Sequence, residues 1–438
     1  MSGLPSRAQV LVVGGGPAGA STAWHLARVG LEVTLVDRAH FPRSKPCAEY
    51  VSPEGARILS AMGALEQLER EHSAALTGMQ VHAPSGNVIH GEFVAQHGFR
   101  GFRDRGLGVR REVLDTILIE RARAAGVRVV EGAKVEDLLR DARGTVTGGR
   151  VRVANGAHAT SIRDVHASLV IGADGLRSVV SHRLGLARTS RWPKRVALVA
   201  HYRGVAGIGT LGEMHVTDNG YVGLAAVGDG LTNVALVVPR TNARSMAGDS
   251  AAFLTAWLAR QPSLAERFRG AERVTPVRAT GPFASRAKRP WAPGALLVGD
   301  AADFYDPFTG EGIYAGLRGG ELAQPFVTEA VRHLASGSSP ARRDADHALR
   351  MYARARVAAF AGKWRVEQLI SAAVAMPWLM NHAARVLGRD RELADLLVGV
   401  TGDFVPPSAV LAPRTLLRFL VPRGLPRAVS PTPVHVHR

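Results

Sequence analysis

The chain has 438 residues, 46% of them hydrophobic and 21% charged, a composition typical of a globular protein with room for two or three domains. Its single cysteine excludes internal disulfides and cysteine-based metal clusters, and no signal peptide is recognised before the first apolar run, so a cytoplasmic location is expected. The formal net charge of +18 comes from arginine, because only five of the 55 basic residues are lysine. The sequence contains no basic tract with interleaved aromatic residues, so nucleic-acid binding is not predicted.

A strand, a glycine turn and a helix near the start of the chain give the first strong signal. The β-branched run Val10–Val13 predicts a buried parallel strand, and the G-x-G-x-x-G pattern of Gly14, Gly16 and Gly19 follows it directly. These glycines allow a tight turn, the close approach of a pyrophosphate and the close packing of a helix expected over residues 17–29. The free N–H groups at the start of that helix would face the phosphates. The stretch therefore predicts a dinucleotide site.

An acidic residue lies where such a site needs one. Residues 31–36 predict a second strand, and Asp37 closes it 18 residues after Gly19. A carboxylate at this position can accept both hydroxyls of an adenosine ribose. A glycine-rich turn without a ligand is the alternative, but it does not account for the strand, the helix and the acid in this order.

Beyond residue 37 the chain is predicted to leave the nucleotide domain and return to it. A proline-rich loop (38–53) and a helix (53–63) come first, and a helix from Arg111 has apolar residues at a period of 3.6. Residues 195–240 alternate between apolar and polar side chains. This alternation predicts an antiparallel sheet that forms the floor of a substrate domain.

The C-terminal part is predicted to be helical. A long helix is expected from Ile313 and mostly helical structure over 342–400, whereas the arginine- and proline-rich end from Pro406 is expected to wrap the surface or to fray. The apolar run Leu369–Met380 is too short to span a membrane. The predicted domains are a discontinuous nucleotide-binding domain (1–75, 104–185 and 275–340), a substrate-binding β-sheet domain (76–103 and 186–274) and a helical C-terminal region with a tail (341–438).

Strand ends followed by glycine occur three times, at Gly14–Gly19, Gly172–Gly175 and Gly299–Gly312. Together, over about 335 residues, they resemble the FAD-dependent hydroxylases and reductases of the para-hydroxybenzoate hydroxylase superfamily. The resemblance implies an α/β fold: a Rossmann-like FAD-binding domain with an inserted antiparallel β-sheet substrate domain and a helical C-terminal region. It also implies FAD as cofactor and NAD(P)H as electron donor.

The resemblance assigns roles to individual residues. Asp37 would bind the adenosine ribose, Arg111 would contact the flavin cofactor and Asp300 would bind the ribityl chain, while Asp174 and Gly175 resemble a motif between FAD and the nicotinamide donor. A turn residue bonded to its own backbone is the alternative for Asp174, and a helix cap the alternative for Asp300. The cofactor-binding residues implied in this way are Gly14, Gly16, Pro17, Ala18, Gly19, Asp37, Arg38, Arg43, Lys45, Cys47, Arg111, Val135, Asp174, Gly175, Gly299, Asp300, Pro307, Gly310, Glu311, Gly312 and Ile313.

The segment Asp306–Ile313 carries the clearest chemistry. Gly310 and Gly312 would let backbone N–H groups approach a planar ligand, and the helix that follows would direct its positive end there. A reduced flavin carries negative charge on its N1–C2=O edge, and dipoles fixed at this edge would stabilise the anion and raise its redox potential. Pro307, Gly310 and Gly312 are therefore candidate catalytic residues, with a packing turn as the alternative.

The loop Phe41–Glu49 narrows the resemblance. It is similar to the loop of the geranylgeranyl reductase and flavin halogenase branches, except that Ala48 follows Cys47 where those branches carry Cys-Gly. Tyr221–Ala226 stands in place of the Tyr-x-Trp-x-Phe-Pro signature of prenyl reductases, and no two of the six tryptophans have the Trp-x-Trp spacing of tryptophan halogenases. Cys47 is either a candidate catalytic residue beside the flavin or a small buried side chain.

Histidine and serine patterns predict no other chemistry. None of the 16 histidines has H-x-x-x-H or H-E-x-x-H spacing with acids, so no metal site is predicted and the histidines are expected on the surface. No G-x-S-x-G pattern indicates acyl transfer.

Three functions follow from these signals. The first is an FAD-dependent, NAD(P)H-consuming monooxygenase that hydroxylates or epoxidises an apolar aromatic or polyketide-like molecule through a flavin C4a-hydroperoxide, with molecular oxygen as co-substrate. The second is a geranylgeranyl reductase-like enzyme that reduces or desaturates an isoprenoid or other alkene, with peripheral contact to a membrane. The third is a flavin-binding protein without turnover. The oligomeric state is not predicted.

Overall fold

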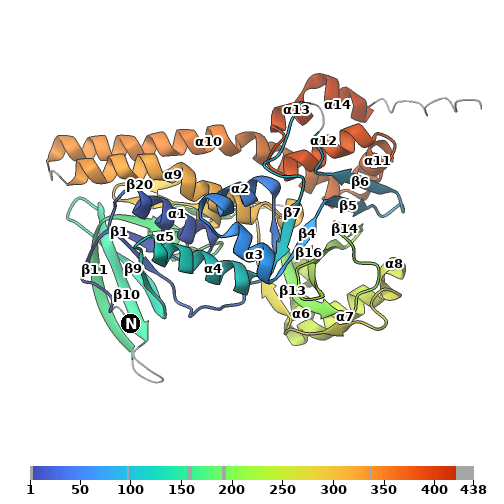
Figure 1. The fold of residues 1–438 in the computed structure, drawn as a ribbon, viewed down its shortest axis with the longest axis horizontal. Helices are drawn as coiled ribbons and strands as arrows, with labels where there is room; N and C mark the ends of the chain where they lie inside the picture. The colour runs from blue at the N-terminus through green and yellow to red at the C-terminus, as the bar shows by residue number, and fades with distance from the viewer. Residues whose placement is uncertain (1–2, 96–97, 155–159, 190–193, 336–337, 421–438) are drawn as a thin grey trace, which may run out of the picture.

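Two eight-stranded sheets form the two main layers of the protein. The computed structural model describes residues 3–95, 98–154, 160–189, 194–335 and 338–420. The long helices α9 (Gly312–Leu334) and α10 (Ser339–Ala375) lie side by side along one edge, and α10 leads to the C-terminal helices near the second sheet (Figure 1).

The first sheet is mostly parallel and has the order β20-β21-β11-β1-β2-β8, extended by the antiparallel strands β10 and β9. Val10 of β1 lies opposite Val33 of β2 and Leu169 of β11, so the run predicted as a buried strand is at the centre. The strands are β1 (Arg7–Val13), β2 (Val33–Val36), β8 (Arg128–Val130), β9 (Ala133–Arg140), β10 (Val146–Ala154), β11 (Thr160–Gly172), β20 (Trp291–Ala292) and β21 (Ala295–Leu297).

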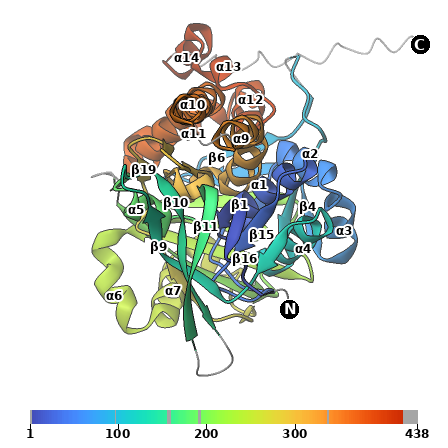
Figure 2. The same cartoon turned by 90° about the vertical axis from the view of Figure 1, so that its left-hand side faces the viewer.

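Helices α1 (Pro17–Arg28), α4 (Arg111–Ala124) and α9 pack with this sheet in one apolar core (Figure 2). Helices α1 and α9 approach so closely that a Cβ on Gly320 would lie 2.5 Å from the backbone nitrogen of Thr22. The close contact places the start of α9 beside the start of α1. Three shorter helices complete this part: α2 (Pro53–Ala61), α3 (Leu65–Glu71) and α5 (Val179–Arg183). One three-stranded sheet consists of β3 (Tyr50–Val51), β7 (Gly106–Val109) and β4 (Ser73–Leu76). Another consists of β12 (Ala187–Thr189), β19 (Ser285–Ala287) and β22 (Asp303–Phe304).

The second sheet has the order β17-β13-β16-β15-β14-β5-β6, with β18 also paired to β13. Its strands are antiparallel except for β14 and β5, which pair in parallel, because β5 enters from a distant part of the chain. Helices α6 (Ala243–Gly248), α7 (Ser250–Ala259) and α8 (Pro262–Ala265) share a core with this sheet. The strands are β5 (Gly78–His82), β6 (Val88–Glu92), β13 (Arg195–Arg203), β14 (Leu211–Thr217), β15 (Gly220–Ala226), β16 (Leu231–Pro239), β17 (Glu272–Arg273) and β18 (Arg278–Thr280).

The C-terminal helices pack with the second sheet. Helix α10 continues into α11 (Pro377–Leu387) and α12 (Arg391–Thr401), which contribute to one core with β5, β6 and β14. The end from Pro406, expected to wrap the surface or fray, forms α13 (Pro407–Leu411) and α14 (Pro413–Leu420); residues 421–438 lie outside the described residues. Among the described helices, none combines the length and apolar character needed to cross a membrane.

Candidate active site

A cavity of about 1430 Å³, measured out to its open mouth, lies where the two sheets meet. All three glycine motifs reach it, through Gly16, Gly175 and Gly312. The remaining wall is largely apolar, which suits a cavity that holds a cofactor at one end and a hydrophobic molecule at the other. Apolar side chains of this wall are Leu76, Met79, Val199, Met214, Leu224, Val237, Phe283, Phe304 and Phe308.

The first glycine turn has the backbone that the sequence predicts. Gly14 has φ of +101°, and a Cβ there would lie 2.6 Å from the carbonyl oxygen of Ala173. A Cβ on Gly19 would overlap the carbonyl oxygen of Gly14. The N-cap of α1 is Gly16, which has no side chain to accept hydrogen bonds from the helix. The first N–H groups of α1 therefore remain available to a ligand.

Asp37 is fixed at the outer end of this turn. Its Oδ2 accepts a hydrogen bond from the Gly15 N–H at 2.7 Å, and its Oδ1 accepts one from the Ala39 N–H at 2.8 Å. The carboxylate is buried and lies just beyond the residues that line the cavity. The backbone thus holds it in the position predicted for a ribose acid.

Cationic side chains surround Gly16. A Cβ on Gly16 would lie 3.5 Å from Nη2 of both Arg43 and Arg111. Arg111 donates to both oxygens of Asp115, at 2.9 and 2.8 Å, and Arg43 lies 3.3 Å from the same carboxylate. Lys45 lines the same cavity, and burial together with the charge of Arg111 lowers its pKa. The concentration of positive charge at a free helix N-terminus suits a diphosphate.

The turn before α9 is anchored from the second sheet. Asp306 accepts hydrogen bonds from Tyr221 Oη at 2.7 Å and from the Phe308 N–H at 3.1 Å, and Arg195 Nη1 lies 2.5 Å from its other oxygen. Gly310 adopts φ of +72°, where a Cβ would lie 2.8 Å from the Tyr50 ring. The turn is therefore held at both ends, with its glycines on the cavity.

Comparison with known proteins agrees with this geometry. A sequence model of the FAD binding domain matches residues 7–320. The chain belongs to this family. It is 32% identical over 334 residues to a digeranylgeranylglycerophospholipid reductase of Methanothrix thermoacetophila, covering 74% of this chain and 78% of the relative. It is 27% identical over 372 residues to the menaquinone reductase of Mycolicibacterium smegmatis, covering 78% and 84%.

Solved structures extend the likeness to the fold. The myxobacterial chondrochloren halogenase, an FAD-dependent halogenase, superposes with a TM-score of 0.69 at 25% identity, covering 80% of this chain and 79% of that one. The predicted superfamily and the predicted fold class are confirmed. The protein is an FAD-dependent oxidoreductase by family.

The residues present fit FAD. The free N-terminus of α1 and the cations around Gly16 suit its diphosphate, and Asp37 suits the adenosine ribose. Asp300 lines the cavity with Lys45, and burial raises the pKa of Asp300 while Lys45 and Arg111 oppose the rise. Asp300 lies in a short 3₁₀ turn, η2 (Gly299–Ala301), so it faces the cavity from the end of β21 as expected of a ribityl ligand.

Several residues from the sequence-based set lie elsewhere. Asp174 accepts a hydrogen bond from the Val179 N–H at 2.6 Å at the start of α5, which is the turn-residue alternative, whereas its neighbour Gly175 lines the cavity. Arg38 is exposed, and Val135 is buried in the core of β9 and β10. Neither of these two side chains lines the cavity.

The loop that carries Cys47 is locked by a buried hydrogen-bond network. Glu49 has φ of +59°, unusual for a residue with a side chain, and its carboxylate accepts from the Arg111 N–H at 2.8 Å and contacts His201 Nε2 at 2.7 Å. Its own N–H donates to Cys47 Sγ at 3.3 Å, and Asn233 donates to the Cys47 carbonyl at 2.9 Å. Cys47 itself is part-buried and lines the cavity.

Sequence reasoning missed most of these supporting residues. Glu49 is the last residue of the loop Phe41–Glu49 and could have been flagged, because an acid beside a cofactor site needs a partner if it is buried. His201, Arg195 and Tyr221 gave no signal, because their partners lie far away in the sequence, 152 residues in the case of His201 and Glu49. Only the folded chain brings them together.

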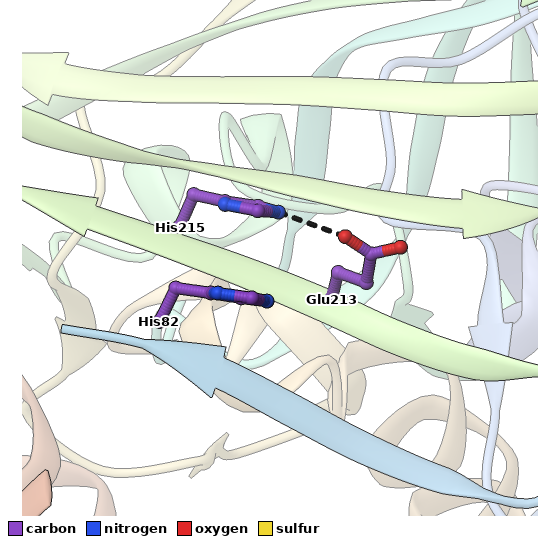
Figure 3. A group of neighbouring side chains, drawn as sticks. All are labelled: His82, Glu213 and His215. Carbon is purple, nitrogen blue, oxygen red and sulfur yellow. Dashed lines mark hydrogen bonds and ion pairs between the residues drawn. The ribbon is translucent and has the colours of Figure 1, made fainter. Parts of the chain in front are cut away.

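Another polar group in the second sheet consists of His82 from β5 and Glu213 and His215 from β14, with ligand-type atoms within 4.8 Å of one another (Figure 3). The two imidazole rings stack with centroids 4.2 Å apart and planes 6° apart, so their nitrogens point the same way rather than at one point. Arg267 donates to both oxygens of Glu213, at 2.6 and 2.8 Å, which already neutralises this carboxylate. As placed, Glu213 is hydrogen-bonded to His215 and Arg267. The expectation of surface histidines is nonetheless wrong for His215 and His201, which are buried.

Proposed function

We propose that the protein is an FAD-dependent reductase that saturates a carbon–carbon double bond in an apolar, isoprenoid-like molecule, with a reduced nicotinamide as electron donor. The observation that carries the proposal is that Cys47 lines the same cavity as Arg111 of the cofactor cradle and the apolar side chains of the wall. The reductases of digeranylgeranylglycerophospholipid and menaquinone among the relatives support it.

Alkene reduction requires a hydride for one carbon and a proton for the other. Bound FAD supplies the hydride once the nicotinamide has reduced it. The chain must supply the proton, and Cys47 is suited to this task because its side chain lines the cavity together with Arg111 and its Sγ is held by a hydrogen bond from the Glu49 N–H at 3.3 Å. After the transfer, the sulfur would regain a proton from water before the next turnover.

The apolar wall would hold the rest of the substrate and exclude water from the reacting carbons. Phe304 and Phe308 line the cavity near the turn with Gly310 and Gly312. Met79 and Met214 line it from strands β5 and β14 of the second sheet. Such a wall favours hydrocarbon chains over polar molecules. It recognises shape and apolar surface rather than a particular functional group.

The test removes the proton donor. Cys47→Ala should slow reduction of the substrate by about 100-fold or more, the usual contribution of a positioned acid, while reduction of bound FAD by the nicotinamide keeps its rate. Stopped-flow absorbance separates the two half-reactions, and Ser44→Ala in the same loop is the control because Ser44 is exposed. In D₂O the product should gain one deuterium from solvent. An undiminished rate of substrate reduction in Cys47→Ala would remove Cys47 from this role.

Oxygen insertion, the first hypothesis from the sequence, is the second candidate. The observation that favours it is Gly223, which lines the cavity and stands where the prenyl reductase signature has the much larger tryptophan. A wider cavity suits the ring systems that monooxygenases bind. Turnover under ¹⁸O₂ distinguishes the candidates, because only a monooxygenase transfers one labelled oxygen atom to the product.

A further inference from the structure

Helix α10 lies against the turn with Gly310 and Gly312 through its residue Lys363, which pairs with Glu311. A second cavity of about 480 Å³, measured out to its mouth, lies there and is lined by Glu311 of the turn and by Lys363 and Glu367 of α10. Helix α10 begins beyond residue 320, where the match to the FAD binding domain ends. The contacts between α10 and the turn are therefore a feature of this chain that the family match does not describe.

Glu311 was expected to face the cofactor, but its carboxylate points to this second cavity. Glu311 is 7% exposed, and one of its oxygens lies 3.1 Å from Lys363 Nζ. Lys363 also pairs with Asp403, which follows α12, and lies 4.7 Å from the centre of the Tyr314 ring. Glu367, one helical turn after Lys363, lines the same cavity as Glu311, and the two carboxyl groups are close enough to interact. One lysine is thus shared by a cluster of three carboxyl groups.

The charges in this cluster do not balance if every carboxyl group is ionised. Lys363 compensates one negative charge, so Glu311, Glu367 and Asp403 together would leave two uncompensated charges in a largely buried place. Two carboxyl groups in hydrogen-bond contact avoid this cost by sharing a proton. Burial, and after it the charge of Glu311, raises the pKa of Glu367 well above its ordinary value, while Lys363 opposes the rise.

The neighbouring charges have partners of their own. Asp303 pairs with Arg356 at 2.8 Å, and Asp306 pairs with Arg195. Asp300 also borders this cavity, but the charge of Lys45 in the main cavity favours its ionised form. No cation other than Lys363 lines the second cavity among the described residues. Glu311 and Asp403 pair directly with Lys363, whereas Glu367 has no ion pair among the described residues. We therefore expect Glu367 to be the carboxyl group that keeps the proton.

We propose that Glu367 holds a proton at neutral pH and donates it in a hydrogen bond to Glu311. Together with Lys363, this carboxyl pair would position the turn with Gly310 and Gly312 and set the redox potential of the flavin bound there. Glu367 is a positioning residue, because it acts through Glu311, which lies between Gly310 and Gly312. The inference rests on FAD binding at this turn and does not depend on which reaction the flavin then carries out.

Proton binding at Glu367 is expected to depend on whether the flavin is reduced. Negative charge that arrives at the flavin edge strengthens proton binding at Glu367, because like charges repel at short range. Over the pH interval in which Glu367 titrates, each two-electron reduction should therefore take up two protons from solvent, one on the flavin and one on Glu367. Outside this interval only the flavin takes up a proton.

The first test needs no cofactor. Protein labelled with ¹³C at the glutamate carboxyl carbon should show, by NMR at pH 7, one protonated carboxyl signal that is absent from Glu367→Gln. If the wild type shows no protonated glutamate at pH 7, the proposal is wrong. This measurement on the wild type decides the question even if the variant does not fold.

The second test follows the midpoint potential of bound FAD with pH, by titration with dithionite. Over the interval in which Glu367 titrates, the wild type should take up one proton more per two electrons than Glu367→Gln does. Lys363→Met should lower the reduced-to-oxidised ratio about tenfold, which corresponds to about 30 mV for two electrons. Asp346→Asn, at the other end of α10, is the control and should behave as the wild type. A Glu367→Gln protein with the wild-type pH dependence would overturn the proposal.

Discussion

The two ends of the main cavity differ in what surrounds their glycines. At the cofactor end, a Cβ on Gly19 would overlap a backbone carbonyl oxygen. At the substrate end, a Cβ on Gly212 would lie 2.7 Å from Met79 Sδ, and one on Gly223 would lie 3.1 Å from Met214 Sδ. Backbone in a packed turn cannot move aside, whereas a thioether side chain has three rotatable bonds. One end is therefore rigid and specific for its ligand, and the other can adapt its shape.

The largest expected effect comes from a matched pair of variants that place a Cβ at each end of the cavity. Gly19→Ala should destabilise the protein by about 4 kcal/mol or more and abolish FAD binding, because neither the turn nor α1 can relax. Gly223→Ala should cost less than about 1 kcal/mol, because only the end of Met214 must move. Urea unfolding with and without FAD measures both. Similar losses in the two variants would contradict the difference between the two ends.

A smaller effect is expected at the edge of the rigid end. Asp37→Ala removes the acceptor of the Gly15 and Ala39 N–H groups and the predicted ribose contact, but it leaves the glycine turn intact. FAD affinity should fall by about 1.5–3 kcal/mol, the value of a hydrogen bond to a charged group. Fluorescence titration of apoprotein with FAD gives this value, and unchanged affinity would show that Asp37 only braces the turn.

The smallest effect concerns the second sheet and depends on pH. Burial alone would raise the pKa of Glu213, but hydrogen bonds from Arg267 and His215 outweigh it and lower the pKa to about 2. Because the folded-state value is depressed, Glu213 stabilises the fold above its ordinary pKa of 4.5, and this contribution is lost as the pH falls from about 4.5 to about 2. The stability difference between wild type and Glu213→Gln should shrink over this interval in thermal unfolding. A constant difference would show that the pKa of Glu213 is not depressed in the folded protein.

The cofactor end could be predicted because its requirements are local in sequence. Gly14, Gly16 and Gly19 act within one turn, and the strand, helix and acid that complete the motif follow within a few residues. The turn at Gly310 and Gly312 was found for the same reason. Where backbone geometry and helix ends decide the binding, a short stretch of residues contains most of the information.

The rest depends on pairings that no short stretch contains. Arg195 donates to Ser371 across 176 residues and thereby joins the second sheet to α10, and the Lys363–Glu311 pair likewise comes from the C-terminal region. Asp174 resembles a cofactor motif, but its carboxylate accepts a hydrogen bond from the Val179 N–H at the start of α5. The adaptable wall of the cavity explains why the substrate has no motif: shape made by many apolar side chains leaves no fixed spacing in the sequence.

The most direct test of the account is to mix photoreduced, FAD-loaded protein with an isoprenoid alkene, geranylgeranylated glycerophospholipid in detergent, without oxygen. We expect the flavin absorbance to return in the stopped flow at a rate that rises with substrate concentration, with one saturated double bond formed per flavin. Flavin that stays reduced until oxygen is admitted, and then yields a product carrying an oxygen atom from O₂, would contradict the reductase and establish the monooxygenase.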